Sequence, residues 1–292
     1  MFEAYFSGED GRNGFIDDNE NYLHDLRSAT KSITSILVGI AFDQKYLSLD
    51  NTLNKYFNNL IPNDNYRIGD VTILQLLTMT SGIGWNQSGM RKKGDVDSET
   101  EMESSKKPIE YILSKKIVFN PGEQFDYNSG NTVLLGKIVE NATGQDLDKF
   151  AKENLFKPLG IVRYCWWDKV NDVYWTHAGL RMKAMDIFKI GQMMLSNGEY
   201  QNKKVLSKIW IDESIKLREK HPGYCFQWWR KSFQGKSKKY HSYFAAGNGG
   251  QYIFIFPLDD MVVVFSGGNY HSELQGQPNE IIQKEIIPSI EF

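Results

Sequence analysis

Hydrophobic residues recur along the chain with two different periods. From Ser28 onward they follow the spacing of one helix face, which predicts a buried helix. The positions that carry this period are Ile33, Ile36, Leu37, Ile40 and Ala41. The pattern and its flanking Asp, Asn and Gly residues predict further helices over 72–79, capped by Asp70, and over 132–141, 146–155, 184–195 and 280–287.

The period changes near residue 223. Aromatic and β-branched runs separated by Gly, Pro and Asp predict strands over 224–229, 252–256 and 261–265, and a short alternating run predicts another over 2–6. This order of elements indicates an α+β fold: an antiparallel sheet flanked by terminal helices, with an inserted all-helical region. We expect residues 1–60 and 186–292 to form the sheet domain and 61–185 to form the mostly helical insertion.

Composition excludes several functional classes. The formal net charge is −2 with a pI near 6.2, so no long-range field favours nucleic acid or an anionic membrane. The five histidines are scattered, and Cys165 and Cys225 lie in no metal-binding spacing. No apolar run is long enough to span a membrane. The first residues lack a secretory signal, which predicts a cytoplasmic location, although only 27 residues precede Ser28 and an upstream start stays open.

A serine followed three residues later by a lysine occurs twice, at Ser28/Lys31 and at Ser104/Lys107. A chain of this composition contains about two such matches by chance. Ser104 lies in the densely charged stretch 91–107, which predicts a solvated loop. Ser28 opens a buried helix, where the free N–H groups of the first turn favour negative charge and a desolvated lysine can serve as base. An ordinary helix start remains the alternative for Ser28.

Two further segments are candidates for chemistry. Tyr127 follows the turn Pro121-Gly122 and precedes a helix, where its hydroxyl could relay a proton or simply pack at the surface. The glycine-rich run 245–251 precedes a predicted strand. It is interpreted either as a place where a substrate carbonyl approaches the backbone or as a tight turn between strands.

Taken together, these segments resemble the motifs of the serine β-lactamase and penicillin-binding-protein superfamily, in its class C-like branch of esterases, D-aminopeptidases and 6-aminohexanoate-dimer hydrolases. Residues 24–34 resemble the nucleophile motif of this branch, and residues 74–82 resemble its "LL-x-M-x-SG" helix end. The tyrosine motif resembles 121–127 followed by Leu134-Leu135-Gly136, and a further family segment resembles 179–191. Their shared order along most of the chain is more specific than any single motif.

The resemblance implies an acyl-enzyme mechanism without metal or organic cofactor. Ser28 would attack a carbonyl, and Lys31 with Tyr127 would handle its proton. The N–H groups of Ser28 and Asn248 would hold the oxyanion, and Gly247 and Ser129 would line the substrate site.

Two departures from the family pattern shape the expected function. The Tyr-x-Asn motif has Ser129 in its third place, and the third motif, Ala245-Ala246-Gly247, lacks the cation that grips a substrate carboxylate. We therefore expect a serine hydrolase of a small ester or amide. A β-lactamase or D-amino-acid peptidase is the alternative within the enzyme class, and a catalytically silent relative that binds a ligand or partner is the alternative outside it. The oligomeric state stays open.

The remaining aromatic, histidine and cysteine residues are expected to be structural. At most one tryptophan of each pair, Trp166-Trp167 and Trp228-Trp229, would face a pocket if these segments are strands. His177 and His241 are expected in solvated turns, and both cysteines in the core.

Overall fold

A computed structural model describes residues 2–6, 8–10, 14–16, 22–87, 96–166, 171–218 and 223–291. Its α-helices are α1 (Thr30–Asp43), α2 (Leu53–Phe57), α3 (Ile73–Leu77), α4 (Ser98–Ser104), α5 (Pro108–Leu113), α6 (Ser129–Thr143), α7 (Leu147–Ala151), α8 (Ala184–Leu195), α9 (Lys208–Ile215), α10 (Gln277–Ile281) and α11 (Ile287–Ile290). Its strands are β1 (Gly8–Asp10), β2 (Gly14–Ile16), β3 (His24–Asp25), β4 (Tyr164–Trp166), β5 (Leu180–Met182), β6 (Glu199–Tyr200), β7 (Lys203–Lys204), β8 (Trp229–Gln234), β9 (Lys239–Gly247), β10 (Gln251–Phe256) and β11 (Met261–Phe265).

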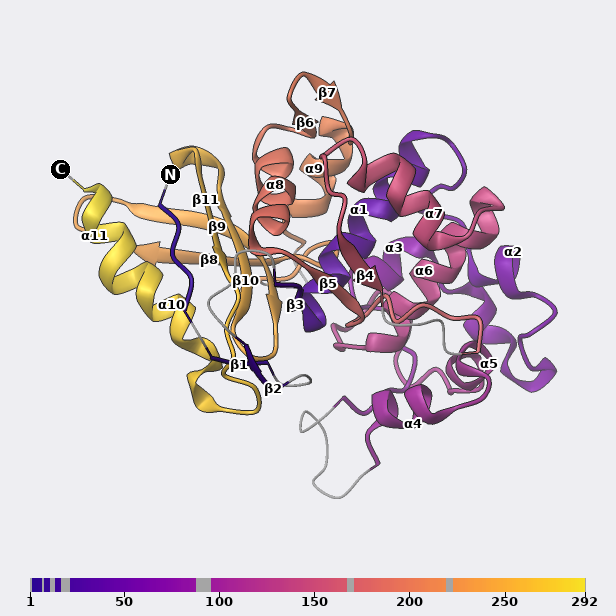
Figure 1. The fold of residues 1–292 in the computed structure, drawn as a ribbon. Helices are drawn as coiled ribbons and strands as arrows, with labels where there is room; N and C mark the ends of the chain where they lie inside the picture. Colours follow the sequence, from indigo (N-terminus) through magenta and orange to yellow (C-terminus); the bar gives the residue numbers. More distant parts are fainter. Residues whose placement is uncertain are drawn as a thin grey trace.

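The largest sheet is antiparallel, in the order β11-β10-β9-β8, and helices cover both of its faces (Figure 1). In β10, Phe254 and Phe256 pack with residues of the terminal helical segment. Ile253 and Ile255 join the main core on the other side, where α8 lies against β10 and β11. Successive side chains of a strand point to opposite faces, so a strand buried on both sides is apolar throughout. The α+β fold with an antiparallel sheet flanked by helices is confirmed.

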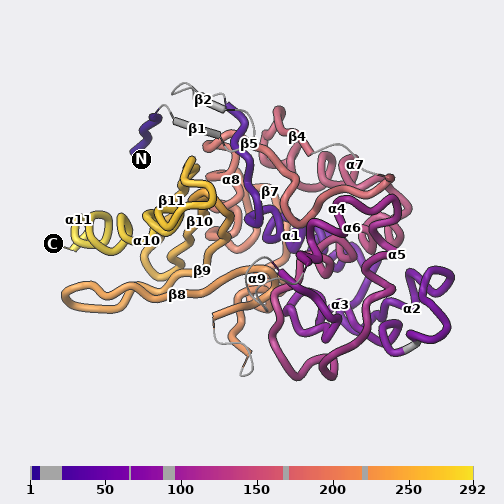
Figure 2. Tube along the Cα trace, turned by 90° about the horizontal axis from the view of Figure 1, so that it is seen from below, coloured from indigo at the N-terminus to yellow at the C-terminus, as the bar shows by residue number. Residues whose placement is uncertain are grey.

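A second, three-stranded sheet in the order β3-β5-β4 joins distant parts of the chain next to α1. Leu26 donates its N–H to the carbonyl of Leu180 at 3.0 Å, which extends this pairing to the residue just before the first helical turn. Figure 2 shows the strands of this sheet beside the start of α1, between the large sheet and the helical part. The carboxyl-terminal end of β3 therefore leads directly into the turn that contains Ser28.

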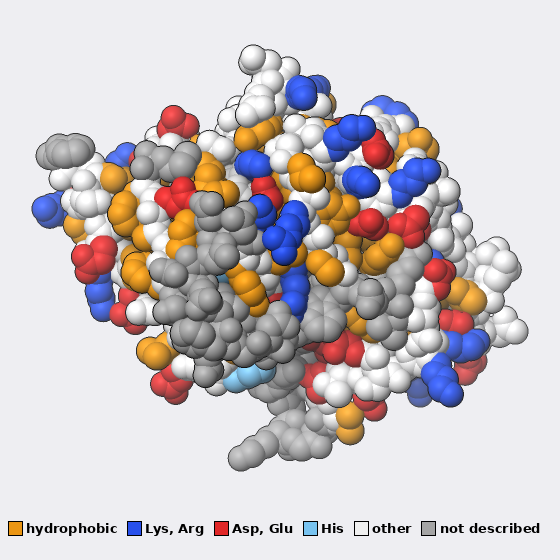
Figure 3. Space-filling model, viewed as in Figure 1, with side chains coloured by type: hydrophobic (Ala, Val, Ile, Leu, Met, Phe, Trp, Pro, Cys, Tyr) orange, Lys and Arg blue, Asp and Glu red, His pale blue; other side chains and the backbone are white. Residues whose placement is uncertain are grey.

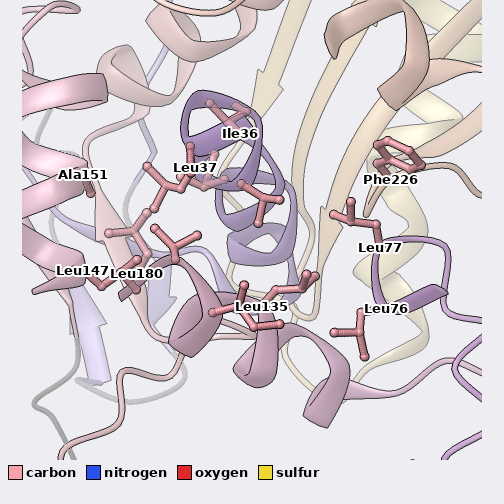
Figure 4. Close-up of a cluster of buried hydrophobic side chains, with 14 of the residues drawn as sticks. Ile36, Leu37, Leu76, Leu77, Leu135, Leu147, Ala151, Leu180 and Phe226 are labelled. Atoms are coloured by element: carbon pink, nitrogen blue, oxygen red, sulfur yellow. The ribbon is translucent and has the colours of Figure 1, made fainter. Parts of the chain in front are cut away.

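Helix α1 is buried along most of its length, which explains why its sequence mixes apolar and small hydroxyl residues. Ile36 and Leu37 contact the cluster drawn in Figure 4, which also contains Leu135 of α6 and Leu180 of β5. The buried hydroxyls find partners: Ser32 donates to the carbonyl of Gln227 at 2.6 Å, and Thr34 donates to that of Thr176 at 2.8 Å. Because buried polar groups must be hydrogen-bonded, these bonds fix two loops around α1.

The proposed division into 1–60 with 186–292 and 61–185 stays a prediction. The range 61–185 contains α3 to α7 together with strands β4 and β5. One continuous hydrophobic cluster includes residues from both expected parts, such as Leu37, Leu135 and Ile255.

Several predicted elements have the expected position. Helix 184–195 and strand 261–265 have the predicted bounds, and the helix over 280–287 is part of the continuous helical segment from Gln277 to Ile290, which includes a π-helical turn, Ile282–Ile286. The helix expected over 132–141 is longer, and the one expected over 146–155 is formed by α7 and a π-helical turn, Lys152–Phe156.

Two predicted strands are wrong. Residues 2–6 have no regular structure, and the first strand begins at Gly8. The segment 224–229 turns instead of extending, because Gln227 adopts a positive φ of 61° and its side-chain amide donates to the carbonyls of Leu76 and Leu77, both at 3.1 Å. Strand β8 starts only at Trp229. A buried polar side chain that binds another segment overrides the local β preference.

The charged stretch 91–107 is not entirely a solvated loop. Residues 88–95 lie outside the described residues, but 98–104 form α4. Asp97 caps this helix by accepting the N–H of Thr100 at 2.8 Å, and Met102 is fully buried. The buried Met102 and the cap help to hold this otherwise polar helix against the fold.

The cap of α3 also differs from the expectation. Thr72, rather than Asp70, accepts the N–H of Gln75 at 3.2 Å, and the Gln75 side chain accepts the N–H of Thr72 at 2.9 Å. This reciprocal pair is a capping box. Asp70 instead lies exposed at the end of a 3₁₀ segment.

Replacing Thr72 by alanine is expected to lower the free energy of unfolding by about 1 kcal/mol, because an N–H of α3 loses its acceptor. Asp70→Ala is the matched control and is expected to change it by less than about 0.5 kcal/mol. Urea unfolding measures both variants. A larger loss in Asp70→Ala than in Thr72→Ala would contradict this assignment of the cap.

The surface carries charges of both signs. Figure 3 shows acidic and basic side chains interspersed on the visible face, in keeping with the small net charge. Among the described residues, no helix combines the length and the apolar character needed to cross a bilayer.

Candidate active site

Ser28 lies in a 3₁₀ turn, η1 (Arg27–Ala29), between β3 and the start of α1. Arg27 adopts a positive φ of 48°, which is costly for a residue other than glycine. Its backbone N–H donates to the Asp25 carboxylate at 3.0 Å, and its Nε lies 3.3 Å from the same carboxylate. The guanidinium also lies over the ring of Tyr270, 5.0 Å from its centroid. These contacts hold the sharp turn that presents Ser28.

Lys31 lies one helical turn after Ser28, as the i, i+3 spacing predicts. Its Nζ donates to Ser28 Oγ at 3.1 Å and to the carbonyl oxygen of His177 at 3.0 Å. The side chain is 1% exposed. A lysine held in this way next to a hydroxyl can, in its neutral form, accept the hydroxyl proton.

Tyr127 also lies next to Lys31. The Lys31 Nζ is 5.0 Å from the centroid of the Tyr127 ring, and this ring is stacked on Trp229 with the centroids 6.0 Å apart. Tyr224 packs edge-on against both rings. Tyr224 is buried, and desolvation raises its pKa well above the ordinary value, so its hydroxyl stays protonated. The aromatic neighbours leave Tyr127 beside the lysine rather than on an outer turn.

The glycine-rich segment joins β9 to β10 as a hairpin whose register pairs Gly247 with Gln251. It is therefore a turn between strands, and it also lies close to the nucleophile. A Cβ built on Gly247 would lie 2.2 Å from the carbonyl oxygen of Leu26 and 3.2 Å from the backbone nitrogen of Ala29. Asn248 follows, with its side-chain oxygen accepting the N–H of His271 at 3.2 Å. Only glycine at 247 lets the end of β9 come this close to Ser28.

Ser129 is the first residue of α6, after Asn128, which caps that helix. It is fully buried, and its hydroxyl donates to the Glu99 carboxylate of α4. The Gln87 amide donates to the same carboxylate oxygen, and the Gln87 carbonyl oxygen accepts the N–H of Ser129 at 3.2 Å. Ser129, the third residue of the tyrosine motif, is thus hydrogen-bonded to α4.

His177, which accepts a hydrogen bond from Lys31, forms a cluster with Glu99 and Glu103 of α4. The His177 ring is fully buried, with Nε2 3.1 Å from Glu103 Oε1 and 3.9 Å from Glu99 Oε1. These three side chains offer ligand atoms that lie within 4.8 Å of one another, so they are the described group whose donor set would suit a divalent cation. The Nε2 atom of His177 already has a carboxylate partner in Glu103.

The structure brings Ser28, Lys31 and Tyr127 together and places Gly247 at the same turn. It does not group Ser104 with them: Ser104 ends α4 at the surface, and Lys107 pairs with Glu110 at 3.2 Å. Trp228 belongs to the core, while Trp229 stacks on Tyr127. Trp166 is buried, and Trp167 lies outside the described residues.

Three structural expectations are corrected. His241 is exposed as expected, but it lies within strand β9 and not in a turn. His177 is not in a solvated turn, because it is buried between Lys31 and α4. Cys165 is exposed on the short strand β4, whereas Cys225 is buried as expected. Sequence reasoning missed Glu99 and His177 as neighbours of the site. Met102, an isolated apolar residue in the charged stretch, could have indicated that this stretch packs against the rest of the protein.

An antiparallel sheet with helices on both faces, together with a serine and a lysine that contact each other one helical turn apart, is typical of the serine β-lactamase and penicillin-binding class. A family model described as Beta-lactamase matches residues 14–273, and the chain belongs to this family.

The relatives found by sequence match about half of the chain. The chain is 29% identical over 140 residues to Protein flp of Staphylococcus aureus, a match that covers 47% of the chain and 26% of that protein. It is 30% identical over 150 residues to monacolin J acid methylbutanoyltransferase of Aspergillus terreus, covering 47% of the chain and 36% of that enzyme. The matched parts thus span about a quarter to a third of these relatives.

Among solved structures, a Bacillus anthracis protein assigned as a 6-aminohexanoate-dimer hydrolase has the same fold. It superposes with a TM-score of 0.77 at 21% identity, covering 96% of the chain and 77% of that protein. At this identity the likeness concerns the fold.

Proposed function

We propose that this protein is a serine hydrolase that forms an acyl-enzyme with a small ester or amide. The observation that carries the proposal is the 3.1 Å contact between Lys31 Nζ and Ser28 Oγ at a buried helix start. In the first step Ser28 Oγ bonds to the substrate carbonyl carbon, and its proton passes to neutral Lys31. The tetrahedral intermediate then breaks its bond to the leaving group, which takes a proton through Tyr127, and water hydrolyses the acyl-enzyme.

The same geometry supports the proposed oxyanion site. Negative charge on the carbonyl oxygen would be stabilised by the N–H groups of Ser28 and Asn248, and the close approach of Gly247 to the turn that contains Ser28 supports this assignment. Gly247 would then form the floor of the substrate site. Because the Ser129 hydroxyl proton goes to Glu99, Ser129 could contact substrate only as an acceptor. Transfer of an acyl group, which the name of the Aspergillus methylbutanoyltransferase describes, would use the same first step.

The substrate class follows from what the third motif lacks. Ala245 and Ala246 occupy the end of β9, where the lactam- and D-alanyl-peptide-binding relatives carry a cation. Arg27 is nearby, but its guanidinium is paired with buried Asp25. We therefore propose a neutral ester or amide ahead of a β-lactam or a D-amino-acid peptide.

Labelling with a fluorophosphonate tests the proposal. We expect a stoichiometric adduct on the peptide that contains Ser28, found by mass spectrometry, and hydrolysis of p-nitrophenyl acetate that stops when the label is complete. No adduct, or an adduct elsewhere, would contradict it. Nitrocefin is the comparison substrate, and turnover of nitrocefin at an ordinary enzymatic rate would instead support the β-lactamase alternative.

A further inference from the structure

The Lys31 side-chain amine is buried, and its direct contacts in the described residues are with neutral groups. They are the Ser28 hydroxyl, the His177 carbonyl and the face of the Tyr127 ring. A buried charge is costly unless an opposite charge lies near it. The carboxylate that interacts electrostatically with Lys31 is Glu99, which reaches the site from α4.

Glu99 is held as an anion by its surroundings. Burial would raise the pKa of its carboxyl, but the interactions with His177 and Lys31 and the hydrogen bonds from Ser129 and Gln87 outweigh burial and lower the pKa from 4.5 to about 2. The carboxyl therefore carries its charge at every pH at which the protein would be assayed. Its two donors belong to separate segments, so the carboxylate is also fixed in position.

His177 links these carboxylates to the lysine. Its backbone carbonyl accepts a hydrogen bond from Lys31, while its side chain contacts Glu103 at 3.1 Å and Glu99 at 3.9 Å. The ring also packs edge-on against Trp175, with the centroids 5.6 Å apart. The residue whose carbonyl accepts from Lys31 is therefore also joined to α4 through its side chain.

We propose that Glu99 is a positioning residue of this site: its carboxylate supplies the counter-charge for Lys31 and, through His177, fixes the orientation of the amine toward Ser28. The proposal rests on the proposed serine hydrolase function. It makes α4, in the charged stretch of the sequence, part of the catalytic centre, although Glu99 itself contacts neither the nucleophile nor, in this scheme, the substrate.

Glu99→Gln tests the charge with little change in shape. Among the described residues, the interactions given for Lys31 are with Ser28, Tyr127, His177 and Glu99, and Glu99 is the carboxylic acid of this group. Removing its negative charge favours the neutral amine, so the acid limb of the kcat/KM profile for p-nitrophenyl acetate is expected to move to lower pH by about 0.5 to 1 unit. We also expect kcat to fall about tenfold or more, since the amine is less well oriented.

Two further variants separate charge from structure. Glu101→Gln, on the same helix but exposed and paired with Lys115, is expected to leave both the limb and the rate unchanged. Glu99→Asp keeps the charge, and is expected to keep the limb within about 0.3 unit while lowering kcat. If Glu99→Gln does not fold, Glu99→Ala with added formate replaces it, and formate but not formamide is expected to restore the rate.

An acid limb in Glu99→Gln that coincides with the wild-type limb, or an equal shift in Glu99→Asp, would overturn the positioning role. So would equal rescue of Glu99→Ala by formate and formamide. Failure of the underlying function is seen separately, because Ser28→Ala would then hydrolyse the ester as fast as the wild type.

Discussion

Ser28→Ala is expected to lower turnover of p-nitrophenyl acetate by roughly four to six orders of magnitude. In the proposed mechanism Lys31 and Tyr127 act on the Ser28 hydroxyl, so the variant would keep only what binding and the oxyanion donors contribute. Fluorophosphonate labelling is expected to disappear as well. Steady-state kinetics and intact-protein mass spectrometry measure the two effects.

The chain offers a matched control for this variant. Ser104 begins the second Ser-x-x-Lys match, but it lies at the exposed end of α4, and Lys107 pairs with Glu110 instead. Ser104→Ala is expected to retain full turnover and full labelling. Retention of more than a tenth of the wild-type turnover by a folded Ser28→Ala protein would rule out Ser28 as nucleophile, and circular dichroism shows whether the variant is folded.

Gly247→Ala is expected to damage stability and activity together. Its Cβ would lie 2.2 Å from the Leu26 carbonyl oxygen and 3.1 Å from Arg27 Cβ, and the first of these contacts is to backbone, which cannot rotate away. The end of β9 must therefore move from η1. We expect a loss of about 1–3 kcal/mol in the free energy of unfolding. A displacement near 1 Å at the oxyanion donors would lower kcat/KM about a hundredfold.

Gly276→Ala is the control for Gly247→Ala. Gly276 has an ordinary negative φ of −82°, and a Cβ built on it meets no atom within 4 Å. It is expected to be as stable and as active as the wild type within about 0.5 kcal/mol and twofold. Urea unfolding and ester kinetics measure both variants, and wild-type behaviour of Gly247→Ala in the two assays would show that the close approach does not matter.

The local chemistry of the nucleophile turn was predictable because it depends on near neighbours in the chain. The i, i+3 spacing of Ser28 and Lys31 becomes a contact in any helix, and the apolar period after Ser28 requires that helix to be buried. The same holds for strand 261–265 and helix 184–195, where local preference and burial agree. The family follows from these motifs in their order.

The wrong predictions for strand 224–229 and for the cap of α3 have different physical reasons. Gln227 has a β-rich neighbourhood, yet its side chain bridges to α3 and α6, and this long-range satisfaction of a buried amide turns the backbone. The two candidate caps of α3, Asp70 and Thr72, lie two residues apart. The exact first residue of the helix decides which of their side chains accepts a free backbone N–H.

By itself, the sequence determined the α+β class, the buried helix that carries Ser28 and Lys31, and the identity of the motifs around them. These features depend on the period of the hydrophobic residues and on the spacing of the motif residues, both of which can be seen directly in the sequence. Only the tertiary structure decided that Trp229 stacks on Tyr127, that Gly247 touches the turn before Ser28, and that Glu99 and His177 surround Lys31. Such contacts join residues far apart in the chain, and they form because buried polar groups and charges must find partners wherever the packing brings them.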